Sequence, residues 1–317
     1  MHSHALCLIP GNLSVLLIFL CLSMGIKAQS SADAQADYMA DDPRVCLVCH
    51  GAGSPVAADS ILQGAHGIVG NTDSPFAPDQ QGCQSCHGPS AAHLRLDPVG
   101  TRPLPAMVFD QRQPAHEQDS VCLGCHETET GHYWSGSGHQ FAELSCASCH
   151  SVHNLVDQTT SFQGGTAQCV SCHQRQQAEI LQASSHPLRS GQMVCTDCHA
   201  PHGGPGPADL RAFTLNEQCF GCHAEKRGPF LWEHAPVAED CSNCHTPHGS
   251  SHRNLLQART PWLCQQCHLA AFHPSNLESG LGIPPRGASG NILGRDCSNC
   301  HTQVHGSNHP SGSGLTR

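Results

Sequence analysis

Twenty cysteines of this chain occur in ten copies of one short pattern, C-x-x-C-H. The copy that begins at Cys195 reads CTDCHAPH, and it returns almost unchanged as CSNCHTPH at Cys241. On one helical turn, residues i, i+3 and i+4 face the same side, so two thiols can bond the vinyl carbons of a haem while the histidine binds its iron. The pattern therefore predicts covalent attachment of haem c.

The ten copies predict ten covalently attached haems. The thiols that would carry them are Cys46 and Cys49, Cys83 and Cys86, Cys122 and Cys125, Cys146 and Cys149, Cys169 and Cys172, Cys195 and Cys198, Cys219 and Cys222, Cys241 and Cys244, Cys264 and Cys267, and Cys297 and Cys300. The proximal iron ligands would be His50, His87, His126, His150, His173, His199, His223, His245, His268 and His301. The alternatives are zinc sites or a disulfide framework, but structural zinc pairs do not require a histidine after every second cysteine.

A second set of ten histidines follows the same repeat. The motifs come in five pairs, and each pair has one histidine between its motifs and one shortly after them. The units begin at Cys46, Cys122, Cys169, Cys219 and Cys264, and the candidate distal ligands are His66, His93, His139, His153, His186, His202, His234, His248, His273 and His305. After residue 28 the chain has only three methionines, so histidine is expected on both faces of each iron. Such haems have lower reduction potentials than those with methionine ligands.

The distal histidine that follows closely on a motif must serve a different haem. His202 lies three residues beyond His199, and three residues extend only roughly 10 Å, too little to pass around the macrocycle. The same holds for His153 and His248, so neighbouring haems are expected to be cross-ligated. His309 competes with His273 for the last haem. Three further histidines, His116, His132 and His252, are interpreted as exposed polar residues.

The protein chain alone has little with which to build a core. Its aromatic content is 4%, it has twenty-two prolines, and successive motif histidines are only 22 to 39 residues apart. We therefore expect a multihaem cytochrome c with haems as its core, mostly irregular loops, short α-helices and little or no β-structure. A short helix is predicted over 174–184.

The N-terminal 44 residues are interpreted as an export signal and a leader. The apolar run over 13–22 is too short to span a bilayer comfortably, so 1–28 is predicted to be a signal peptide cleaved near Ala28, with an uncleaved anchor as the alternative. Cleavage would remove Cys7 and Cys21, the two cysteines outside the motifs. Residues 29–44 are expected to form a flexible leader. The formal net charge of −10 argues against a nucleic-acid partner.

Three longer stretches resemble one family. CHAEKRGPFLWEHAPV from Cys222, LCQQCH from Leu263 and QVHGSNHP from Gln303 are similar to the DmsE/MtrA family of periplasmic decahaem cytochromes c. The resemblance implies an elongated haem wire of two pentahaem halves, here 45–183 and 184–317. It also implies a wire threaded through a porin-like outer-membrane β-barrel, with a periplasmic or inner-membrane cytochrome c donor and an outer-surface multihaem cytochrome or reductase as further partners. The departures lie mainly in the leader and in the loop over 94–118.

The expected function is electron conduction rather than catalysis. The resemblance implies transfer between periplasmic carriers and an outer-surface terminal reductase or extracellular metal. One alternative is a soluble periplasmic storage or shuttle cytochrome, and another is a multihaem reductase of a small nitrogen or sulfur oxyanion. A reductase needs an iron with an open position, and the chain has no C-x-x-C-K site and enough histidines to cap every iron. The direction of electron flow is left open, as is the choice among metal oxide, dimethyl sulfoxide and ferrous iron.

Overall fold

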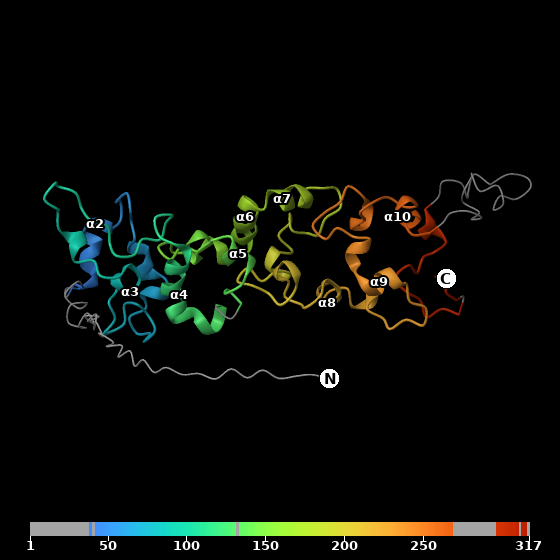
Figure 1. The fold of residues 1–317 in the computed structure, drawn as a ribbon, viewed down its shortest axis with the longest axis horizontal. Coiled ribbons are helices and arrows are strands. Elements are labelled where there is room, and N and C mark those ends of the chain that lie inside the picture. The colour runs from blue at the N-terminus through green and yellow to red at the C-terminus, as the bar shows by residue number, and fades with distance from the viewer. Residues whose placement is uncertain (1–37, 40–41, 131–132, 269–295, 311, 316–317) are drawn as a thin grey trace, which may run out of the picture.

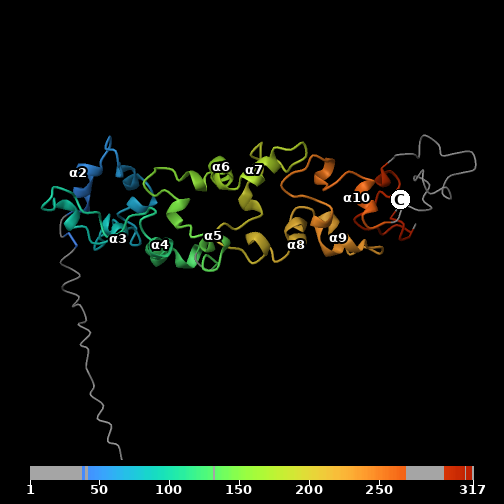
Figure 2. The same cartoon turned by 45° about the horizontal axis from the view of Figure 1, so that its top comes forward.

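The computed structural model describes residues 38–39, 42–130, 133–268, 296–310 and 312–315. The predicted signal peptide, Cys7, Cys21, His132, His273 and most of the leader lie outside these residues. Within them the molecule is elongated, and the chain advances along the long axis in sequence order (Figures 1 and 2). The elongated shape agrees with the expectation from the sequence.

Helices are short. The α-helices are α2 (Leu47–His50), α3 (Gln84–His87), α4 (Ala115–Thr130), α5 (Gly138–Phe141), α6 (Phe162–Cys172), α7 (Gln174–Ile180), α8 (Leu215–Phe220), α9 (Ala235–Glu239) and α10 (Trp262–Gln265). Single 3-10 turns lie at Pro43–Cys46, Asp59–Gln63, Ala65–Gly67, Ala92–Leu94, Cys146–Ser148, Gln158–Thr160, Cys195–Asp197, Pro207–Asp209, Ala224–Lys226, Arg253–Leu255, Cys241–Asn243 and Cys297–Asn299. Even α4 is interrupted, because the backbone leaves helical angles at His126.

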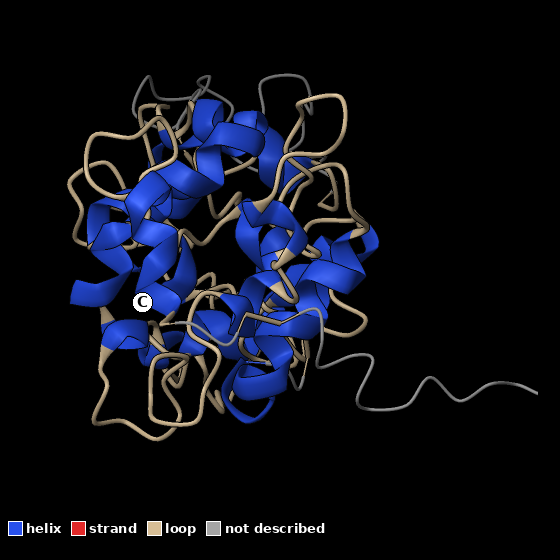
Figure 3. Ribbon diagram, turned by 90° about the vertical axis from the view of Figure 1, so that its left-hand side faces the viewer, coloured by secondary structure: helices blue, strands red, loops and turns tan. Residues whose placement is uncertain are grey.

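No strand occurs among the described residues, which contain only isolated β-bridges. Seen along the long axis, helices and loops lie on all sides (Figure 3). One bridge joins Ser184 to Ser250, and it explains why the helix predicted over 174–184 ends at Ile180: the residues beyond leave the helix to reach a segment far along the chain. The predicted fold class, with short helices, irregular loops and little or no β-structure, is confirmed.

The side chains alone form a very small core. Among the described residues only Ala77, Trp134, Ile180 and Leu210 are buried hydrophobic residues, and no large side chain is fully buried. A folded domain of this length ordinarily buries many large apolar side chains. A set of large apolar cofactors along the axis therefore fits the chain better than a core made of protein.

Candidate functional site

Each attachment motif forms one compact turn. The histidine N–H donates to the carbonyl of the first cysteine of its own motif, at 2.9 Å for His150 and 3.0 Å for His199 and His245. This bond is the i to i+4 bond of a helical turn, and it holds the two thiols and the imidazole of one motif on one side. The local structure is thus the one that covalent haem attachment requires.

The thiols of successive motifs lie next to one another in chain order. The first cysteines of the two motifs in each unit lie close enough to interact, and these pairs are Cys46 with Cys83, Cys122 with Cys146, Cys169 with Cys195, Cys219 with Cys241, and Cys264 with Cys297. The second cysteines interact across the unit boundaries, and these pairs are Cys86 with Cys125, Cys149 with Cys172, Cys198 with Cys222, and Cys244 with Cys267. The ten motifs therefore form a single row, from the first to the tenth.

Nine motif histidines each face one of the distal candidates. Their ring centroids are 5.8 to 6.5 Å apart in the pairs His50 and His93, His66 and His126, His87 and His153, His139 and His173, His150 and His202, His186 and His223, His199 and His248, His234 and His268, and His245 and His305. Two imidazoles on opposite sides of one metal, each bound at about 2 Å, have centroids roughly 6 Å apart. The spacing fits one iron between each pair.

The pairs follow a rule that crosses the units. A histidine between the two motifs of a unit faces the first motif of the next unit, as His139 faces His173. A histidine after a unit faces the second motif of the unit before, as His202 faces His150. His202 is thus placed away from the haem site of His199, as the short spacing between these residues requires. The first unit closes on itself, because His93 faces His50.

The other ring nitrogen of these histidines is held by the protein. Carbonyl oxygens accept from Nδ1–H at 2.5 to 3.0 Å in His50, His87, His93, His139, His186, His199, His234, His245 and His301. Since a carbonyl can only accept, Nδ1 carries the proton and Nε2 keeps its lone pair. Nε2 is therefore available to a metal, and the ring orientation is fixed by the backbone.

Two carbonyls show how the backbone is shaped for this task. Ala208 and Asn254, with φ of 54° and 57°, lie nine residues after His199 and His245 and present their carbonyls to those imidazoles. Positive φ is uncommon for residues with a side chain. The same local conformation thus recurs at the same distance from two motifs.

Burial favours the neutral form of several of the distal candidates. It is the main cause that lowers the pKa of His66, His153, His202 and His305 from the ordinary imidazole value. Neighbouring histidines add to this effect, His150 and His139 in the case of His202. The neutral imidazole is the form that ligates metals.

In two of the units, a polar residue just before the first motif is hydrogen-bonded to the backbone of the second motif. Asp119, which is 3% exposed, accepts from the N–H of Cys146 at 2.8 Å and from the indole N–H of Trp134 at 2.8 Å. Asn216 accepts from the N–H of Cys241 at 2.7 Å in the same way. Each lies three residues before the first cysteine of its unit. Sequence reasoning missed these residues, although their matching position in two repeats was a usable signal.

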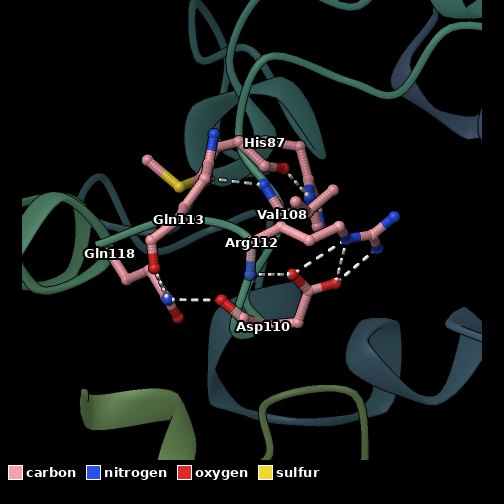
Figure 4. A network of polar contacts seen from close by, with 7 residues as sticks. His87, Val108, Asp110, Arg112, Gln113 and Gln118 are labelled. Carbon is pink, nitrogen blue, oxygen red and sulfur yellow. Dashed lines mark hydrogen bonds and ion pairs between the residues drawn. The ribbon is translucent and has the colours of Figure 1, made fainter. Parts of the chain in front are cut away.

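The loop after the second motif is held by backbone and glutamine contacts (Figure 4). Met107 pairs with His87 twice, because its N–H donates to the His87 carbonyl and its carbonyl accepts from the His87 ring, both at 2.9 Å. Gln113 Oε1 accepts from the Val108 N–H at 3.0 Å, and Gln118 Nε2 donates to the carbonyls of Asp110 and Gln113. The segment over 94–118 thus orients His87, the histidine of the second motif.

The remaining histidines lie outside the nine ring pairs. The His301 ring donates to the Gly314 carbonyl at 2.6 Å, and the His309 N–H donates to Ser307 Oγ at 3.0 Å. The alternative between His273 and His309 at the last site stays a prediction. His116 is exposed and His252 is half-buried.

The donor set suits haem better than a bare metal ion. In the described part of the chain, no three His, Cys, Asp or Glu side chains are grouped to hold an ion, and all twenty motif cysteines are free of disulfides. The buried indole N–H of Trp232 has no acceptor among the protein atoms described, and an acidic group of a bound cofactor would satisfy it. None of the described helices has the length and apolar character needed to cross a membrane.

Paired attachment turns, opposed imidazoles and the near absence of a protein core define a multihaem c-type cytochrome with covalently bound haem. Comparison with known proteins agrees. The family model "Doubled CXXCH motif" matches residues 186–228 and 234–271, and the model "Cytochrome c-type protein NrfB-like" matches 83–165.

Two relatives are similar to this chain. The multiheme cytochrome MtrA of Shewanella baltica is 44% identical over 287 residues, which cover 90% of this chain and 84% of that protein. The cytochrome c-type protein NrfB of Haemophilus influenzae is 26% identical over 160 residues, 46% of this chain and 70% of that protein. The chain belongs to the MtrA family of multihaem cytochromes and is an electron-transfer protein rather than an enzyme.

Proposed function

We propose that this cytochrome carries ten haems c, one at each motif, and conducts electrons along the row. The donors would be periplasmic or inner-membrane cytochromes c, and the acceptor would be an outer-surface multihaem cytochrome or reductase, or an extracellular metal. Haem supplies one-electron redox chemistry when bound. The observation that carries the proposal is the set of nine opposed histidine pairs, arranged in chain order along an elongated molecule.

The chain's own residues do three things in this proposal. The twenty motif cysteines would fix the cofactors covalently, and the nine histidine pairs would close both axial positions of nine of the ten irons. The carbonyls that accept from Nδ1–H hold those rings in place. Because both axial positions are filled at these nine sites, none of the nine is left open for a substrate, which favours conduction over a reductase.

Cross-ligation also keeps neighbouring sites together. His202 and His199 are three residues apart, yet their rings face His150 of the fourth motif and His248 beyond the eighth motif. One tight turn thus joins the fourth site to the sixth. The two pentahaem halves, 45–183 and 184–317, would be linked through this turn, because His150 and His202 lie on opposite sides of that boundary.

The cellular setting is part of the proposal. Residues 1–28 would direct export, and the row would cross the outer membrane inside a separate porin-like β-barrel. Membership of the MtrA family supports this setting, and the formal net charge of −10 suits the polar lumen of such a barrel.

Liposomes that enclose an oxidised dye test the proposal. External reductant should reduce the dye in liposomes that contain the cytochrome with its co-purified barrel, and not in liposomes exposed to the cytochrome alone. Loss of the fourth haem, through Cys146→Ser with Cys149→Ser, should abolish transfer, whereas His116→Met at an exposed position should not. Equal rates with and without the barrel would contradict the need for a sheath. Transfer that survives loss of the fourth haem would contradict conduction along the row.

A further inference from the structure

Two of the histidines proposed as ligands differ at Nδ1 from the nine rings held by carbonyls. Nine have a backbone carbonyl as acceptor, but His150 donates to Asp157 Oδ2 at 2.5 Å and His248 donates to Glu179 Oε2 at 3.2 Å. Both carboxylates are largely covered, with side chains 24% and 21% exposed. A third carboxylate, Glu225, is 3.9 Å from His223 Nδ1, beyond hydrogen-bond distance, and 61% exposed.

A carboxylate acts on a ligating imidazole more strongly than a carbonyl does. Hydrogen bonds to an ionised acceptor are roughly twice as strong as those between neutral groups. By drawing the Nδ1 proton toward itself, the carboxylate makes Nε2 a more basic ligand. A more basic ligand stabilises the ferric state over the ferrous state, and hydrogen bonding to the ligands is one of the ways a protein sets a haem potential.

We propose that Asp157 and Glu179 lower the reduction potentials of the haems attached at Cys146 and at Cys195, the fourth and the sixth in the row. His150 is the proximal histidine of the fourth site, and His248 faces His199 of the sixth. This inference rests on the ligand pairs of the proposed function. Reduction adds one electron at each site, and no bond forms or breaks.

The two carboxylates are held differently, and the difference predicts unequal effects. Asp157 uses its other oxygen to accept from the Thr159 N–H at 3.0 Å, a neutral donor. Glu179 uses its other oxygen to accept from Arg175 Nε at 2.9 Å. The guanidinium withdraws negative charge from Glu179. This effect is screened by solvent, because the Arg175 side chain is 84% exposed. With its longer bond as well, Glu179 should lower the potential less than Asp157.

The position of the two sites gives the inference a consequence for conduction. The fourth and sixth sites flank the fifth, near the middle of the row of ten motifs. An electron that crosses the row must pass both of them. The carboxylates therefore raise the energy of an electron in the middle of the row relative to a row with carbonyl acceptors only.

Spectroelectrochemical titration of the haem-loaded protein tests the inference, with Asp157→Asn, Glu179→Gln and Arg175→Gln. Asp157→Asn should raise the reduction potential of one component by at least about 59 mV, which for one electron is a tenfold rise in its reduced-to-oxidised ratio at a fixed applied potential. Glu179→Gln should raise a different component by a smaller factor. Arg175→Gln should lower the component that Glu179→Gln raises. The double variant Asp157→Asn with Glu179→Gln should show both shifts, because the fifth site separates the two.

Glu225→Gln is the matched control, since it neutralises a carboxylate near a ligand but out of hydrogen-bond reach. It should move no component by as much as either test variant. Unchanged potentials in both Asp157→Asn and Glu179→Gln would overturn the inference, and so would shifts of the same sign in Glu179→Gln and Arg175→Gln. If Asp157→Asn fails to load haem, Glu179→Gln and Arg175→Gln still test the proposal, because they should shift the potential of one component in opposite directions. The liposome assay is independent of these potentials, so failure of conduction and failure of the tuning are distinguishable.

Discussion

Replacement of His202 by methionine should convert one haem from bis-histidine to histidine–methionine ligation. The His202 ring is 5.8 Å from that of His150, so the affected haem should be the one attached at Cys146 and Cys149. Covalent attachment at Cys195 and Cys198 should be unaffected. Axial ligands span roughly 0.8 V of haem potential, so a rise on the order of 0.1 V is expected for one haem in ten. Redox titration with near-infrared magnetic circular dichroism measures the potential and the methionine ligation together.

A double variant tests whether His202 and His248 serve different haems. His248 faces His199, so His202→Met with His248→Met should create two separate histidine–methionine haems. His116→Met is the control, because His116 is exposed and belongs to none of the nine ring pairs. A single altered haem in the double variant would mean that both histidines serve one iron. No altered haem in His202→Met would remove His202 from the ligand set.

Three further changes test the scaffold. Asp119→Ala leaves one buried and one half-buried N–H group without this acceptor, so the free energy of unfolding should fall by about 3 kcal/mol in guanidinium titrations followed by Soret circular dichroism. Glu117→Ala, at an exposed position, should change it by nearly zero, and equal effects of the two variants would contradict the role of Asp119. Gly249→Ala would place a methyl group against the Glu179 backbone and should cost about 1–3 kcal/mol, whereas Gly70→Ala meets open space and should cost far less. Burial lowers the pKa of several distal histidines, so the unfolded chain binds more protons below the ordinary imidazole pKa of about 6.5. The stability contributed by these neutral rings is therefore present above that pH and lost as the pH falls through it. A melting temperature that stays constant from pH 7.5 to 5 would contradict this reasoning.

The sequence predicted the attachment turns and the fold class because the motif is local. Residues i, i+3 and i+4 meet on one turn whatever the rest of the chain does. The small core also followed from composition, since a chain with 4% aromatic residues and twenty-two prolines has little else to pack. The helix predicted over 174–184 was too long, because Ser184 pairs with Ser250, a contact across 66 residues that local propensity does not contain.

The pairing of the histidines was only partly predictable. Chain length excludes His202 from the haem of its own motif, but many partners satisfy that condition, and the sequence alone does not select His150. The carboxylates were missed for the same reason. Asp157 follows its histidine by seven residues, whereas Glu179 precedes His248 by 69, so no shared spacing marks them.

Electron paramagnetic resonance of the fully oxidised, haem-loaded protein tests the central claim most directly. If histidines occupy both faces of every iron, the spectrum should integrate to ten low-spin ferric haems, matched to the haem and iron content of the same sample. A high-spin signal equal to one full haem in intact protein would contradict the account, because it would reveal an iron with an open position of the kind a reductase needs.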